Sequence, residues 1–210
     1  MVFKILRFLW PPVDAYRANR VLKKKIEERC ANTYRQIFDE FVKKTSEKFY
    51  PNELFSEIEK LEQAEVHRKD VLESKASSLI NILAVVVALI VLVPAILGND
   101  WSLPRYLATG ATLLFTLAVI HLVISVYYAT KATKVGPFHM GSADSIRDLV
   151  VQDPDNFLNS LAARKLANIK LNQPRLIIKS NFLVTAQELF IRGLIFLGLG
   201  ALVVLFYRIL

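Results

Sequence analysis

The sequence predicts an all-α membrane protein with three transmembrane helices, and two observations support this fold class. Apolar residues make up 53% of the 210 residues, above the roughly 45–50% of a soluble domain, and they are concentrated in three stretches with almost no charge. In addition, no segment shows the alternation of apolar and polar residues that is typical of a half-buried strand. The remaining segments are charged and helical in pattern.

The first two spans are predicted to form an antiparallel hairpin over residues 79–128. Residues 79–97 carry no charge, and residues 106–128 carry none apart from the titratable His121. About 20 residues of helix cross the roughly 30 Å of bilayer hydrocarbon, so both stretches are long enough. The connection between them is short, and its Trp101 is placed where an aromatic belt belongs.

A third span is predicted within residues 188–210, although its uncharged stretch, residues 193–207, is shorter. Arg192 and Arg208 bracket this stretch, and their long side chains can reach opposite headgroup layers. Glu188 lies one helical turn before Arg192, so the two are expected to pair along the helix.

Lysine and arginine set the expected orientation. They are concentrated in residues 1–78 and 129–187 and are nearly absent from the 98–105 loop and the C-terminal tail. Basic segments next to membrane helices favour the cytoplasmic side. We therefore expect a multi-pass protein of the cell (inner) membrane, with a cytoplasmic N-terminus and the C-terminus outside.

Residues 13–78 are predicted to form a cytoplasmic helical hairpin and stalk. Its first helix should extend to about residue 49, because Pro51 interrupts the pattern. Asn52 is a candidate N-cap for the second helix. No proline or glycine follows before Pro94, so this helix should continue into the first span without a break.

Glu65 and Arg68 fall among the apolar positions of that second helix. They are either a partly exposed ion pair of little energetic weight or a polar layer that sets register or responds to a partner.

Two further segments flank these elements. Residues 1–12 predict either a segment lying on the membrane surface or a hydrophobic flap on the protein's own core. Residues 129–187 predict a second cytoplasmic helical segment. One helix is expected to end near residue 171, and a new helix is expected to begin at Gln173-Pro174 and to become the third span.

Small and polar side chains in the spans share helix faces, which lets membrane helices approach closely and form hydrogen bonds. The first span has one such face, made of Ser77, Asn81, Ala84, Ala88 and Ala95. The second span has two, made of Thr109, Thr112 and Thr116 and of Gly110, His121, Ser125 and Tyr128. The sequence leaves open whether these faces pack inside one protomer, between protomers or along a pore.

Single residues within the spans also lead to hypotheses. An ionisable side chain inside the membrane is a functional candidate because burying it in lipid is costly; for His121 the alternative is a neutral, hydrogen-bonded packing residue. Gly193 and Gly200 share a face of the third span, where a close helix approach is expected, whereas Gly198 lies elsewhere.

No pattern in the sequence predicts catalysis or a bound cofactor. The three histidines are far apart and lack metal-ligand spacing, and there is no glycine-rich phosphate loop or nucleophile elbow. The net charge of +8 arises from basic residues interleaved with acidic ones. That pattern favours solvated helix faces and attraction to anionic lipid headgroups over nucleic-acid binding.

Residues 72–81, which read LESKASSLIN, resemble the start of the first span in Pycsar transmembrane effectors and SLATT-type proteins, which are small prokaryotic antiviral membrane effectors. Residues 179–193 are similar in style to their last segment. Glu73 replaces the aspartate of the Pycsar pattern, and residues 1–65 do not resemble a cyclic-nucleotide-binding domain. The resemblance therefore implies a membrane effector that is switched by a separate cytosolic sensor, such as a nucleotide-generating complex or a short prokaryotic Argonaute.

The expected function is that of an abortive-infection effector that forms a homo-oligomer and depolarises or permeabilises the membrane when it is activated. The alternatives are a non-toxic anchor or scaffold for a cytosolic partner and a housekeeping ion-channel component.

Overall fold

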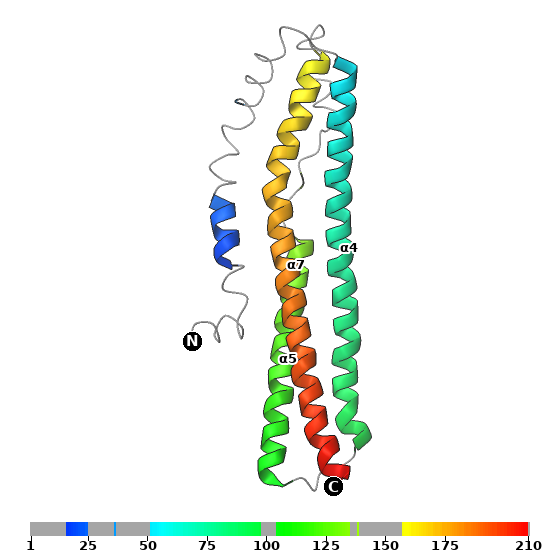
Figure 1. The fold of residues 1–210 in the computed structure, drawn as a ribbon, viewed down its shortest axis with the longest axis vertical. Helices are drawn as coiled ribbons and strands as arrows, with labels where there is room; N and C mark the ends of the chain where they lie inside the picture. The colour runs from blue at the N-terminus through cyan, green and yellow to red at the C-terminus, as the bar shows by residue number, and fades with distance from the viewer. Residues whose placement is uncertain are drawn as a thin grey trace. The chain divides into compact units, whose positions relative to one another are not determined.

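The computed structural model describes residues 16–24, 36, 51–97, 104–134, 138 and 157–209. Residues 16–24 are helical, and three long helices follow: α4 (Pro51–Leu97), α5 (Arg105–Thr133) and α7 (Phe157–Ile209) (Figure 1). No strand occurs among the described residues. Each long helix has a segment long and apolar enough to cross a membrane. The all-α class and the three membrane-spanning helices are thus confirmed.

The chain divides into two compact units. We call residues 72–134 and 180–210 the spanning unit, to which the division also assigns residues 1–15. We call residues 16–71 and 135–179 the stalk unit. Of the first stalk helix predicted over residues 13–49, only residues 16–24 and residue 36 are described, and the predicted surface segment 1–12 lies outside the described residues.

Helix α4 runs for 47 residues without interruption, which confirms the predicted continuity of stalk and first span. It begins at Pro51, so Asn52 lies inside the first turn and is not the predicted N-cap. Proline suits the first helical position, because the amide hydrogen that it lacks would have no partner within the helix there.

Helix α7 corrects the prediction that Gln173-Pro174 separates two helices. It is one helix of 53 residues with Pro174 inside it. An internal proline costs about 3 kcal/mol, but the residues on both sides are firmly packed: Asn172 and Leu176 are each 3% exposed. Packing of this face outweighs the local preference of proline to end a helix.

The stalk unit holds α4 and α7 together through a small apolar core and an ion pair. Ile58, Ala162 and Ile169 form the core, and Phe55 packs against it. Lys165 places its Nζ 2.8 Å from a carboxylate oxygen of Glu62.

In the spanning unit, α5 and α7 approach each other closely through small residues. A Cβ added at Gly193 would lie 2.8 Å from the side chain of Leu122, whose own exposure is 0%, and 3.3 Å from the carbonyl oxygen of Ala118. A Cβ at Gly200 would lie 3.3 Å from the ring of Phe115, whereas one at Gly198 would meet nothing within 4 Å. The predicted division of these glycines is confirmed.

Replacing Gly193 by alanine should destabilise the spanning unit by about 1–3 kcal/mol, which is the usual cost of overpacking. The matched change Gly198→Ala should be neutral or stabilising, since alanine favours a helix by roughly 1 kcal/mol over glycine. Unfolding in detergent, followed by circular dichroism, measures both. Equal stability of the two variants would contradict the close approach at Gly193.

Candidate functional site in the spanning helices

The small and polar face of α4 points away from the packed side of the helix. Ser77, Asn81, Ala84 and Ala88 are all exposed. The residues that α4 buries in this unit are Ala76, Leu79 and Leu83, and at 3.6 residues per turn they lie on roughly the opposite side of the helix. Among the residues that the structure describes, none buries this face.

Of the residues on this face, Asn81 is the most costly to place in hydrocarbon without a hydrogen-bond partner. Counting the roughly 20 residues of a span back from Leu97 places Asn81 about 6 Å inside the inner edge of the hydrocarbon. No hydrogen-bond partner for its side chain occurs among the described residues. An amide that enters hydrocarbon without a partner costs several kcal/mol, so this position favours contact with another polar group.

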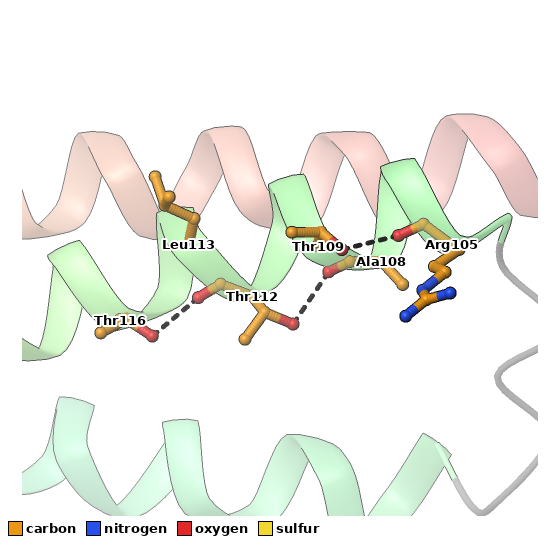
Figure 2. A pocket seen from close by; sticks show the side chains of 6 residues that line it. All are labelled: Arg105, Ala108, Thr109, Thr112, Leu113 and Thr116. Carbon is orange, nitrogen blue, oxygen red and sulfur yellow. Dashed lines mark hydrogen bonds between the residues drawn. The ribbon is translucent and has the colours of Figure 1, made fainter.

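The threonine face of α5 behaves differently. Thr109, Thr112 and Thr116 are exposed, and each hydroxyl donates a 2.8 Å hydrogen bond to the backbone carbonyl four residues earlier. With Arg105 at one end, they line an open hollow of about 490 Å³ (Figure 2). Because their own helix already satisfies these hydroxyls, the threonines do not require a partner. Their oxygens still present free lone pairs to the hollow.

The opposite face of α5 meets α7. Ser125 is fully buried and donates a 2.7 Å hydrogen bond from Oγ to the carbonyl oxygen of Ala186. His121 is 5% exposed, and its ring centroid lies 5.2 Å from that of Phe196. Tyr128 is half-buried, 5.9 Å from the ring of Phe182, whereas Gly110 is exposed. The predicted polar face of His121 and Ser125 is thus an α5–α7 contact.

Arg192 and Glu188 form the predicted ion pair, with Nη2 and Oε2 3.6 Å apart. The side chain of Arg192 is only 15% exposed. Counting 1.5 Å per residue from Tyr207 places Arg192 about 22 Å across a hydrocarbon layer of roughly 30 Å. Glu188 compensates the charge of Arg192 within the same helix. The side chain of Arg208 lies outside the described residues.

In the stalk unit, Glu65 is half-buried and Arg68 is exposed. Burial raises the pKa of the Glu65 carboxyl above its ordinary value, and this rise is opposed by the positive charge of Arg68 and by a hydrogen bond with Gln173 of α7. One carboxyl oxygen, Oε2, is buried without a partner among the described residues. Glu65 thus links α4 to α7, as a residue of a polar layer would.

Sequence reasoning overlooked one polar position of α7. This residue is Lys179, which is 3% exposed. The sequence pattern that could have predicted the burial of Lys179 is a helical spacing, which places four residues on one helix face: Asn172, Leu176, Lys179 and Leu183. All four are buried.

No group of three histidine, cysteine or acidic side chains that could hold a metal ion occurs in the part of the chain that the structure describes. No protein-family model, no curated protein and no solved structure matches the chain.

Glu65 should make the stability of the stalk unit depend on pH. Since its pKa is raised in the folded state, the folded protein holds this proton at a pH where the unfolded chain has released it. Stability from this group is therefore present at acidic pH and lost as the pH rises through the raised pKa. Glu65→Gln should raise the thermal stability near neutral pH and flatten this dependence.

The matched control is Glu57→Gln, because Glu57 pairs with Lys60 on the exposed surface. It should leave both the stability and its pH dependence nearly unchanged. Thermal melts between acidic and neutral pH test the pair of variants, and an unaltered pH profile in Glu65→Gln would refute the role given to Glu65.

Proposed function

We propose that this protein is a membrane effector that assembles from several copies of the chain and lets ions cross the cell membrane when a cytosolic partner activates it. The observation that supports this best is the exposed face of α4, on which Asn81 has no partner among the described residues. A second copy supplies what the single chain lacks.

Symmetry favours this partner. In a cyclic assembly, each copy places Asn81 at the same depth in the membrane. The amide carries both donors and an acceptor, so identical side chains can bond to one another. Ala84 and Ala88 lie on the same face, where small side chains allow two helix backbones to approach closely.

The exposed threonine face of α5 supports the passage of ions through such an assembly. The threonine oxygens of α5 provide hydrogen-bond acceptors within the membrane, which suits water and cations. No catalytic step is needed for this activity, and the proposal therefore assigns none.

The biological setting and the orientation belong to the same proposal. The resemblance of residues 72–81 and 179–193 to Pycsar transmembrane effectors and SLATT-type proteins supports a role in antiviral defence, in which depolarisation kills or arrests the infected cell. The concentration of lysine and arginine in residues 1–78 and 129–187 supports a cytoplasmic N-terminus and stalk unit. That side of the membrane is where a cytosolic sensor can act.

Cysteine cross-linking in membranes tests the assembly, with Cys30, the only cysteine, changed to serine. Ala84→Cys should form disulfide-linked dimers, because this residue lies on the face with Asn81. Ile82→Cys is the matched control. Ile82 lies at nearly the same depth as Ala84 and is 51% exposed, but it is about 160° away from Ala84 around the helix, and it should not cross-link.

Adding Asn81→Leu to Ala84→Cys should reduce cross-linking by about threefold to thirtyfold, which corresponds to roughly 0.6–2 kcal/mol per interhelical hydrogen bond. The same Asn81→Leu change in the full chain should weaken depolarisation measured with a potential-sensitive dye under activation by the partner. Equal cross-linking at both cysteine positions would contradict assembly through this face. Depolarisation that is unchanged by Asn81→Leu would contradict its role in permeation.

A further inference from the structure

The proposed function does not use the ring of His121, a buried titratable group of the spanning unit. It is 5% exposed, and its Nε2 atom is buried without a hydrogen-bond partner in the described part of the chain. Buried polar atoms without partners are rare in native structures, and each costs about 1–3 kcal/mol. Such a cost within a membrane span favours a functional explanation.

The hydrogen bond of the ring fixes its tautomer. Nδ1 lies 2.8 Å from the carbonyl oxygen of Leu117, and because a carbonyl can only accept, Nδ1 carries the hydrogen. The neutral ring therefore leaves a bare lone pair on Nε2, in an environment that includes the ring of Phe196. This nitrogen is the atom to which a proton can bind.

The surrounding charges balance only while the ring is neutral. Helix α7 contributes Arg192 and Glu188, which pair with each other. The spanning part of α4, residues 79–97, carries no charge. On α5, the titratable groups of residues 106–128 other than His121 are the tyrosines Tyr106, Tyr127 and Tyr128. One positive and one negative charge thus cancel, and a proton on His121 would add a positive charge with no counter-ion.

We propose that His121 binds a proton and that this proton separates α5 from α7. A charge without a counter-ion is far more costly in hydrocarbon than in water. The neutral form leaves little room for water near the ring, because Leu122, the next residue, packs directly on Gly193. Admitting water between the two helices relieves the cost, so protonation favours the separated state and acidification regulates the contact.

Spin labels within one protomer test this inference without depending on assembly through α4. Val123 on α5 and Ile195 on α7 are 58% and 52% exposed, so labelled cysteines at these positions do not disturb the contact. The full chain, with Cys30→Ser, is reconstituted in liposomes with an excess of unlabelled protein, and the distance between the labels is measured by electron paramagnetic resonance. When the pH is lowered from about 8 to about 5, the distance between the labels should become longer and its distribution broader.

Three variants separate His121 from other causes of a pH response. His121→Phe keeps a ring against Phe196 and His121→Gln keeps a neutral polar group, and both should lose the shift completely. His67→Gln is the matched control, because His67 is an exposed histidine of the stalk unit, and it should retain the full shift.

A distance that does not change with pH in the unsubstituted protein would overturn the proposal. A shift that persists in either His121 variant, or that disappears in His67→Gln, would overturn it as well. The distance between the labels on α5 and α7 does not depend on contacts between copies through α4. The experiment therefore distinguishes failure of the proposed assembly from failure of the proposed proton switch.

Discussion

Hydrocarbon offers no hydrogen-bond partner, so a polar side chain inside the membrane must find one within the protein or remain at a cost of several kcal/mol. The spanning unit meets this constraint in three ways. The threonines of α5 bond to their own backbone, Ser125 bonds across to Ala186, and Arg192 pairs with Glu188. Asn81 and the Nε2 atom of His121 are left over. We therefore connect Asn81 with assembly and the Nε2 atom of His121 with proton binding.

Close packing between α5 and α7 determines what a proton on His121 would do. Leu122 packs on Gly193 and Phe115 on Gly200, so the two helices meet along a face with little spare volume. A face packed in this way does not deform gradually: a new charge either stays in place at high cost or separates the helices. In the stalk unit, by contrast, Glu65 bonds to Gln173 at a half-buried position, where water moderates the cost of charge.

The sequence predicted the fold class, the length of α4 and the close approach at Gly193, because these depend on local hydrophobicity and residue size. It did not predict that α7 passes through Pro174, because the packing of Asn172 and Leu176 that supports the helix there is tertiary. A helical pattern also shows which residues share a face without showing which face is buried. The group of Asn81 and Ala84 was therefore visible in the sequence, but its exposure required the structure.

In the proposed assembly, Asn81 finds its hydrogen-bond partner in a second copy of the chain. The most direct measurement counts copies in a bilayer by stepwise photobleaching of singly labelled protein at low density. For the unsubstituted chain we expect several bleaching steps per complex, and for Asn81→Leu we expect mainly one, because the hydrophobic replacement no longer needs a polar partner. A single step in the unsubstituted chain, or the same distribution of steps in both proteins, would contradict the account.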